Sequence, residues 1–322
     1  MSTFLKKGIP ATLVLLAVYM TSMAQKDGNI VEYFGREVIE EINEGAVIHV
    51  FNEGLMLPAA SQGRGLLPET DIIAWLYANG TWITPENGQL IHPIYSGNDS
   101  VFTWQTVKAN EENSFGGRML RRSFLYTQFQ APREEIVLLD ARGHTQGYIN
   151  GKPIAGDHYD FGYTLIPFKL KKGLNEFIYT PGRFGRVTSR LVAPAKPVML
   201  TTRDMTVPSL IKGETDELWA AVRVINTQEK DMDDLTIRCI LESGEVATYK
   251  TDRVMEMSVR KVKFRIPSTS IKHEDGKVQA TLVLIDKNEK ELHRISFELS
   301  QREANTHHER TFVSNIDGSV QY

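Results

Sequence analysis

Four consecutive residues combine side chains that are well suited to ligand binding. Asp157-His158-Tyr159-Asp160 places two carboxylates and an imidazole in one short segment. Oxygen ligands in such a loop can bind Ca²⁺, and the same groups can form hydrogen bonds with sugar hydroxyls. The alternative is a polar turn in which the aspartates accept hydrogen bonds from backbone amides. The residue types by themselves leave both interpretations open.

Aromatic side chains form a second group of candidates. Trp75, Tyr77 and Trp82 lie close together in the sequence, and Trp104 follows them. A flat aromatic ring can stack on the apolar face of a pyranose while polar groups orient the sugar. Large aromatic residues also fill hydrophobic cores, which is the alternative for each of them. The candidate ligand-binding residues of the chain are therefore Trp75, Trp82, Asp157, His158, Tyr159 and Asp160.

A glycine-rich stretch supplies two arginines. Arg183 and Arg186 lie on either side of a phenylalanine in Pro181-Gly-Arg-Phe-Gly-Arg186. Arginine in such a loop can contact an anion or the edge of a substrate. A plain turn is the simpler interpretation.

Several catalytic and cofactor motifs are absent from the sequence. It contains no Gly-x-Ser-x-Gly, the nucleophile turn of α/β-hydrolases, and no phosphate-binding loop. The single cysteine excludes a disulfide framework and any cysteine-based zinc or iron–sulfur site. We therefore expect no catalytic residues, no cofactor and no metal site in this chain, apart from the calcium alternative above.

The composition is that of a globular protein with little net charge. Of the 322 residues, 41% are hydrophobic and 24% are charged, and the formal net charge is −3. This balance excludes the disordered and low-complexity classes. A nearly neutral chain offers little electrostatic attraction for nucleic acid, so we expect none as a partner.

β-strands must position these candidates. Between Lys261 and Ile266 every second residue is apolar, and similar alternation recurs along the chain. Residues that alternate in this way point to opposite faces of a sheet, one in a core and one in water. The other predicted strands are Val47–Phe51, Glu135–Leu139, Glu176–Tyr179, Arg186–Val192, Ala220–Ile225, Leu235–Leu241, Val278–Ile285 and Glu291–Leu299.

Turn signals separate the predicted strands, and helical patterns are scarce. Asn150-Gly151 suits a type I′ hairpin, because both central residues of that turn need a positive φ. Glu69–Leu76, which follows Pro68, has a short helical pattern. Short strands with frequent turns and no β-α-β rhythm indicate an all-β fold built from sandwiches or barrels.

The proline-containing segment Ala193-Pro-Ala-Lys-Pro197 predicts an extended connection between two domains. The first domain then covers residues 25–194 and the second covers residues 198–301. The second domain has the size and strand rhythm of an immunoglobulin-like sandwich. Residues 302–322 begin as a polar linker and continue as a hairpin pattern around Asp317-Gly318.

A lone hairpin is marginal in water, so we interpret residues 302–322 as a linker and the start of a truncated third domain. The alternative is a tail that pairs with one of the two sandwiches.

Residues 1–24 predict export. Two lysines precede an apolar stretch that has the length of a signal peptide and is too short to span a bilayer stably. After cleavage no later stretch is apolar enough to cross a membrane. We expect a periplasmic or extracellular protein without a membrane span, and the alternative is an N-terminal membrane anchor.

Longer stretches resemble known proteins. The first runs from Val31 to Gly54, and the second combines Tyr148-Ile-Asn-Gly-Lys152 with Leu170-Lys-Lys-Gly-Leu-Asn-Glu176. The second pattern is similar to the galactose-binding-like jelly rolls attached to many secreted bacterial hydrolases. Together with Trp219–Asn226 and Ser314–Tyr322, these stretches make the chain resemble the N-terminal region of secreted prolyl-oligopeptidase-type α/β-hydrolase proteins.

The resemblance implies a galactose-binding-like jelly roll followed by an immunoglobulin-like β-sandwich. In that family a C-terminal domain carries the catalytic Ser, Asp and His, for which this chain has no matching positions. The resemblance therefore implies a non-catalytic accessory or substrate-binding region of a secreted serine hydrolase or peptidase. Its partners would be a catalytic domain in cis after residue 322 and a polysaccharide, glycoconjugate or peptide substrate. The alternatives are a stand-alone secreted carbohydrate-binding module or an adhesin.

Overall fold

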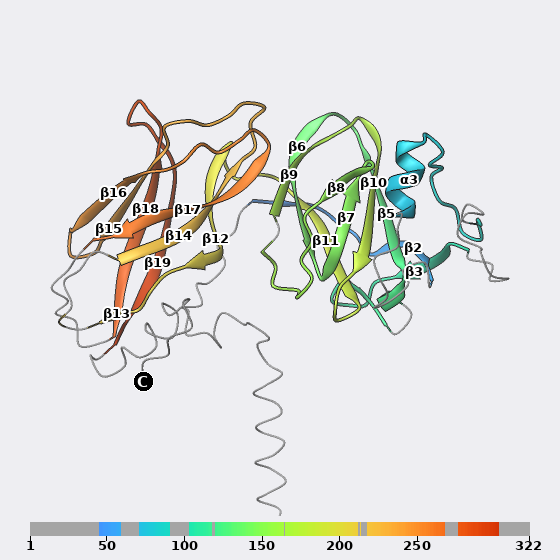
Figure 1. Ribbon diagram of the computed structural model, residues 1–322, viewed down its shortest axis with the longest axis horizontal. Coiled ribbons are helices and arrows are strands. Elements are labelled where there is room, and N and C mark those ends of the chain that lie inside the picture. Colours follow the sequence, from blue (N-terminus) through green and yellow to red (C-terminus); the bar gives the residue numbers. More distant parts are fainter. Residues whose placement is uncertain are drawn as a thin grey trace, which may run out of the picture.

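A computed structural model describes residues 45–58, 71–90, 103–117, 120–163, 165–211, 213, 218–267 and 276–302. Nearly all of the regular structure in these ranges is β-strand, arranged in two units that lie side by side (Figure 1). The prediction of an all-β fold is confirmed. The predicted signal peptide at 1–24 and residues 303–322 of the terminal segment lie outside the described residues.

The first unit is a jelly-roll-like sandwich of two antiparallel sheets, which we call sheet 1 and sheet 2. The strands of sheet 1 are β1 (Val47–Val50), β4 (Ser114–Gly116), β6 (Glu135–Arg142), β9 (Leu165–Leu170) and β11 (Arg186–Val192). Their order is β1-β11-β6-β9, with β4 also paired to β11. The strands of sheet 2 are β2 (Glu53–Leu57), β3 (Gln105–Lys108), β5 (Phe124–Ala131), β7 (His144–Ile149), β8 (Lys152–Ile154) and β10 (Gly173–Pro181). Their order is β3-β2-β5-β10-β7-β8.

Alternation along the strands separates the core from the outer faces. Val137 and Leu139 of β6 are fully buried and lie in the core between the two sheets. Because successive side chains of a strand point to opposite faces, Asp140 and Arg142 of the same strand lie on the outer face of sheet 1. The predicted strands Glu135–Leu139 and Arg186–Val192 are thus present, the former extended to Arg142.

The turn prediction at Asn150-Gly151 is also confirmed. The two residues have φ values of 50° and 79° and connect β7 to β8. Both values fall in the left-handed region that a type I′ turn requires.

A short helix covers the outer face of sheet 2 (Figure 1). The helix α3 (Ile72–Ala78) begins three residues after the predicted start at Glu69. The reason is that Asp71 is its N-cap: the carboxylate accepts hydrogen bonds from the backbone amides of Ile73 (2.9 Å) and Ala74 (3.2 Å). A single 3₁₀ turn, η2 (Leu120–Arg122), precedes β5. No helix in the described ranges is long and apolar enough to cross a bilayer.

The second unit is an immunoglobulin-like sandwich of a three-stranded and a five-stranded sheet, called sheet 3 and sheet 4. The strands of sheet 3 are β12 (Val198–Thr206), β14 (Leu218–Asn226) and β17 (Ser258–Ile266), in that order. The strands of sheet 4 are β13 (Leu210–Ile211), β15 (Thr236–Leu241), β16 (Val246–Lys250), β18 (Lys277–Ile285) and β19 (Glu291–Arg302). Their order is β13-β19-β18-β15-β16, and the β13–β19 pair is parallel.

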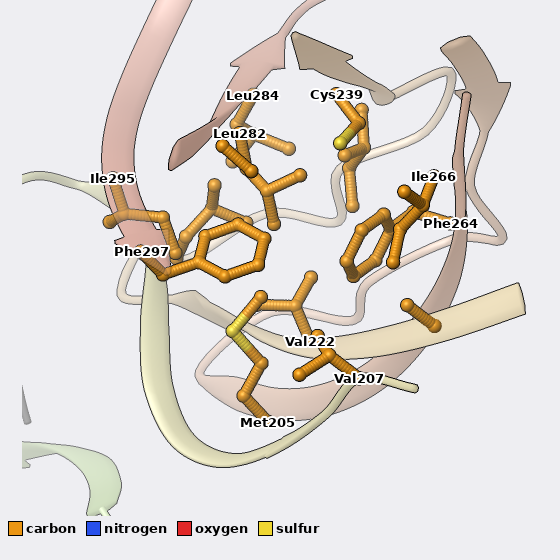
Figure 2. Close-up of a cluster of buried hydrophobic side chains, with 14 of the residues drawn as sticks. Met205, Val207, Val222, Cys239, Phe264, Ile266, Leu282, Leu284, Ile295 and Phe297 are labelled. Atoms are coloured by element: carbon orange, nitrogen blue, oxygen red, sulfur yellow. The ribbon is translucent and has the colours of Figure 1, made fainter. Parts of the chain in front are cut away.

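Apolar side chains from both sheets meet between them, as Figure 2 shows for Val222, Phe264, Leu282 and Phe297. Cys239 belongs to this core, and burial raises the pKa of its thiol to about 12. The cysteine is a buried apolar residue, in agreement with its position in a predicted strand.

The two units share an interface on the outer face of sheet 1. Leu138, Leu165 and Val192 of the first unit form one buried cluster with Met199 and Ile225 of the second. β11 ends at Val192 and β12 begins at Val198, on either side of the proline-containing connection. The second unit therefore covers one part of the outer face of sheet 1 and leaves the remainder exposed.

Candidate functional site

The exposed remainder of this face contains a pocket of about 400 Å³. Strands β1, β4, β6 and β11 form it together with the turn before β4 and the loop after β8. Its lining residues are Val50, Glu112, Asn113, Ser114, Asp140, Arg142, Asp160, Arg186, Thr188, Ser189 and Arg190. Nearly every lining side chain can donate or accept a hydrogen bond, so the pocket suits a polar ligand.

Strand pairing brings the charged lining residues together. On β11, Arg186, Thr188 and Arg190 alternate with buried residues and therefore share the outer face. Arg190 lies opposite Asp140, and Thr188 lies opposite Arg142, on the adjacent strand β6. Antiparallel pairing thus builds the floor of the pocket from residues about fifty positions apart in sequence.

Asp140 organises the arginines of this floor. Its carboxylate, 2% exposed, accepts hydrogen bonds from Arg190 Nε (2.7 Å) and from Arg203 Nη1 (2.7 Å) and Nη2 (2.9 Å). The Nε atom of Arg142 lies 3.6 Å from it. Burial alone would raise the pKa of Asp140, but the hydrogen bonds and charge of Arg203, with the charges of Arg142 and Arg190, outweigh it and lower the pKa. Asp140 therefore stays ionised at neutral pH and cannot act as a general acid.

Of the six candidate ligand-binding residues from the sequence, Asp160 is the one that lines the pocket. It has a φ of 60°, and its Oδ2 pairs with both Nε and Nη2 of Arg186. Arg186, one of the two arginines for which the sequence suggests an anion contact, also lines the pocket. This ion pair holds the exposed Arg186 side chain at the pocket.

Asp157 has a structural role instead. It is 5% exposed, and its carboxylate accepts hydrogen bonds from the backbone amides of Phe161 (3.0 Å) and Gly162 (2.9 Å). This is the amide-capping turn that was the alternative interpretation. The capped loop fixes the position of Asp160.

His158 and Tyr159 lie on the surface of the same loop. His158 Nδ1 forms a hydrogen bond with Thr145 Oγ1 (2.9 Å). Tyr159 is 43% exposed and stacks on Phe161 with a centroid distance of 5.7 Å. Tyr159 therefore presents an aromatic ring beside the residue that lines the pocket.

The geometry gives no support to a calcium site at Asp157 and Asp160. Backbone amides engage the first carboxylate and a guanidinium engages the second. In the described ranges, no group of three or more His, Cys, Asp or Glu side chains is arranged to hold a metal ion.

Trp75, in α3, and Trp82, just after it, are not in the pocket but lie on the outer face of sheet 2. Trp82 stacks on Tyr77 with a centroid distance of 4.7 Å, and its Nε1 donates to both carboxylate oxygens of Glu176 (3.1 and 3.2 Å). Trp75 is half-buried against the same apolar cluster. The structure thus separates the two tryptophans from the loop at 157–160.

Glu176 is a feature that reasoning from the sequence missed. Besides Trp82, it accepts hydrogen bonds from the hydroxyls of Tyr77 (3.3 Å), Thr84 (3.1 Å) and Tyr126 (3.1 Å). Burial first, and then the charge of Glu176, raises the pKa of Tyr77 and Tyr126. The glutamate gathers aromatic residues from three segments into a structural cluster.

Comparison with known proteins gives no family. No family model matches the chain, and no curated protein matches it. Among solved structures, a calcium-binding mutant of β-glucuronidase 2 of Bacteroides uniformis aligns with 78% of this chain and 32% of its own, at 13% identity and a TM-score of 0.35. The exo-chitosanase of Amycolatopsis orientalis aligns with 80% of this chain and 34% of its own, at 12% identity and a TM-score of 0.35.

A GH2 β-galacturonidase of Eisenbergiella tayi aligns with 83% of this chain and 44% of its own, at 11% identity and a TM-score of 0.35. This chain thus spans less than half the length of each of the three. At these identities and TM-scores the alignments transfer neither activity nor ligand. None of the three is a prolyl-oligopeptidase-type protein, so they add no support to that resemblance.

Proposed function

We propose that this chain is a non-catalytic accessory region that binds a saccharide through the pocket on sheet 1. The observation that carries the proposal is the polar lining of that pocket, which strands of one rigid sheet hold in place. A volume of about 400 Å³ falls in the range of small-ligand sites. Hydroxyl, amide, carboxylate and guanidinium groups all line it, and these are the partners that sugar hydroxyls need.

Two exposed aromatic rings support a sugar as the ligand. Tyr159 precedes Asp160 in the loop, and Phe184, 50% exposed, lies 5.8 Å from the guanidinium carbon of Arg186. An aromatic ring beside a polar pocket can contact the apolar face of a pyranose. The candidate loop at 157–160 thus contributes to the proposed site through Tyr159 and Asp160.

The lining is suited to binding and unsuited to hydrolysis. Among the lining hydroxyls, Ser189 Oγ is the one that lies in the core between the sheets, and it forms a hydrogen bond with Tyr179 Oη (2.7 Å). No histidine belongs to the lining. Asp140 and Asp160 are both held by arginines, and the lowered pKa of Asp140 removes it as a proton donor.

The wider context of the proposal rests on the sequence. Export is favoured by the signal peptide predicted at 1–24. A serine hydrolase or peptidase is favoured by the resemblance to secreted prolyl-oligopeptidase-type proteins and by the hairpin pattern after residue 302. In such a protein the two units would hold a substrate near the catalytic domain and so raise its effective concentration. A stand-alone carbohydrate-binding module or adhesin remains the second candidate. An open reading frame beyond codon 322 that encodes Gly-x-Ser-x-Gly supports the first candidate, and an immediate stop codon in independent sequences supports the second.

Binding to a glycan array tests the central claim. The parent protein should bind at least one class of saccharide, and Thr188→Tyr should abolish the signal, because the ring fills the pocket while tyrosine suits a strand. Thr248→Tyr is the matched control, since Thr248 is an exposed strand residue of β16 in the other unit. Equal binding by the parent and Thr188→Tyr would place the site elsewhere, and no binding to any saccharide would refute the proposed function.

A further inference from the structure

The pocket on sheet 1 brings several guanidinium groups together. Arg142, Arg186 and Arg190 line it, and Arg203 lies directly behind Asp140. These four cations face three carboxylates, those of Asp140, Asp160 and Glu112. Asp140 is shared by three of the four guanidiniums, so the floor retains positive charge after its internal ion pairs are formed.

The arginines are fixed before a ligand arrives. Arg190 contacts Asp140 through Nε and Nη2, and Arg186 contacts Asp160 through the same two atoms. Arg142 packs against Gly162, where a Cβ atom would lie 2.6 Å from its Cζ. A side chain held in this way loses little conformational freedom when it binds, which favours affinity.

The fixed arginines still reach solvent. The side chains of Arg186 and Arg190 are 59% and 42% exposed, whereas Asp140 is 2% exposed. A molecule in the pocket therefore meets the guanidinium of Arg190 more readily than Asp140, the carboxylate that orients it. Asp160, which orients Arg186, is 12% exposed and lines the pocket. Glu112, the third carboxylate, lines the pocket from the exposed turn before β4 and not from strands β6 and β11.

From this arrangement we infer that the ligand is an acidic saccharide whose carboxylate contacts the guanidinium of Arg190. The inference rests on the proposed function and names its substrate class. A planar carboxylate matches the donor geometry of guanidinium groups, and hydrogen bonds between two charged groups are stronger than those between neutral ones. Ser114, Asn113 and Thr188 line the same pocket and can bind the hydroxyls of the sugar ring.

The second unit contributes a positioning residue. Arg203 is 3% exposed on its side chain, donates to both oxygens of Asp140 and donates through Nη1 to the carbonyl of Gly162 (3.0 Å). It cannot touch a ligand in the pocket, but it neutralises Asp140 and fixes the loop that carries Asp160. The binding site of the first unit is therefore complete only when the second unit is docked.

Titration calorimetry of the full chain tests the inference. The ligands are trimers of galacturonic, glucuronic and mannuronic acid, each paired with its methyl ester, which keeps the ring and removes the charge. At least one acid should bind more tightly than its ester by about tenfold or more, because a charge-assisted hydrogen bond contributes a binding free energy that corresponds to about this factor in affinity. The difference should shrink as salt is added.

Two arginine substitutions assign the effect to the pocket. Arg190→Gln should reduce acid binding about tenfold more than ester binding, since the amide keeps a donor and loses the charge. Arg238→Gln is the matched control, because Arg238 is also a strand arginine with a carboxylate partner, Glu289, and lies in the other unit. Circular dichroism and a melting curve confirm that each variant is folded.

The outcomes separate the two proposals. Equal affinity for acid and ester, or tighter binding of a sulfated trimer than of every uronate, overturns the carboxylate inference. If neutral glycans bind and Thr188→Tyr abolishes their binding, the proposed function stands and the acidic ligand does not. If no saccharide of any charge binds, both proposals fail.

Discussion

One buried side chain near the loop beside the pocket, the imidazole of His144, makes the stability of the protein depend on pH. His144 is fully buried on β7, and its Nε2 donates to the carbonyl of Ala155 (3.2 Å). Its Nδ1 therefore carries no hydrogen, and it has no partner within the described ranges. Burial lowers the pKa of His144 and outweighs the opposing effects of the Ala155 carbonyl and of Asp157. The folded protein thus contains a neutral imidazole at this position.

We expect the stability of the protein to decrease as the pH falls below about 6.5, the value for a free histidine. In that range the unfolded chain binds a proton at position 144 and the folded chain does not, so acid favours unfolding. Urea denaturation between about pH 5 and pH 8 measures the slope. His144→Gln should flatten it, although His49 and His293, whose pKa values burial also lowers, keep part of it. An unchanged slope in His144→Gln would contradict the assignment.

Glu176 provides a second prediction, because one carboxylate accepts from four side chains. Glu176→Gln keeps the shape, but it replaces one acceptor oxygen with a donor nitrogen and removes the charge. We expect a loss of about 2 kcal/mol in the free energy of unfolding, as for a buried hydrogen bond that loses its charged partner. Urea denaturation followed by tryptophan fluorescence reports it, since Trp82 is one of the donors. Glu298→Gln, at an exposed ion pair of β19, is the control and should change little.

Strand β11 combines the two environments on which the site depends. Val187 and Leu191 point into the core between the sheets, whereas Arg186 and Arg190 point to the pocket. Val192, at the end of the strand, belongs to the interface with the second unit. Because side chains alternate with a period of exactly two residues along a strand, a shift of one position would exchange core and pocket. The register of β11 is therefore a requirement for the site.

The hairpin between β7 and β8 fixes the segment that leads to the loop at 157–160. Gly151 has a φ of 79°, and a Cβ atom added there would lie 2.5 Å from the ring of Tyr77 on α3. Glycine therefore satisfies two demands at this turn, a left-handed backbone and a close approach to an aromatic ring.

Gly151→Ala should lower the free energy of unfolding by about 3 kcal/mol, the sum of a backbone penalty and a steric conflict. Gly173→Ala is a matched control, because Gly173 has a φ of 93° and nothing within 4 Å of an added Cβ. It should lose about 1 kcal/mol, the backbone penalty alone. Chemical denaturation of both variants measures the two losses in the free energy of unfolding. Equal losses would show that the Tyr77 ring moves aside without a cost in free energy.

The whole molecule depends on the interface that joins the two units. Apolar residues from both units form its centre, and the Asp140–Arg203 ion pair lies beside them. Arg223 of the second unit adds a hydrogen bond from Nη1 to the carbonyl of Tyr163 (2.6 Å). The interface and the pocket share Asp140, so the relative position of the units and the geometry of the site are set together.

Arg203→Met should destabilise the interface by about 3 kcal/mol, because it removes one partner of a buried ion pair. Scanning calorimetry should show the two units unfolding at separate temperatures, and acid-saccharide binding should weaken although Arg203 touches no ligand. Arg253→Met, which removes an exposed arginine paired with Asp233, is the control and should leave both measurements unchanged. A single transition at the parent temperature in Arg203→Met would show that the ion pair does not hold the units together.

Low pH tests the same interface without a mutation. The folded pKa of Asp140 is lowered, so its contribution to stability is present above the unfolded value of 3.8 and is lost as the pH falls through the folded value. Separation of the two unfolding transitions in the parent protein should therefore appear only below about pH 4.

Local patterns of the sequence determined much of the fold. Alternation from Lys261 to Ile266 predicted a strand with one buried face, and the strand is β17. Asn150-Gly151 predicted its turn, because only a few residue types adopt positive φ readily. The capping alternative for Asp157 was also visible, since an aspartate reaches the amides just after it. Each of these features depends on residues that are neighbours in the chain.

Only the tertiary structure decided where the candidates lie relative to one another. It placed Asp160 beside Arg186, and Trp82 beside Glu176 on the opposite side of the sandwich. It also made Arg203 of the second unit a partner of Asp140 in the first. The physical reason is that a pattern of period two tells which face a residue occupies but not which strand lies next to it. That choice comes from the burial of whole sheets, and it turned scattered arginines into the lining of one pocket.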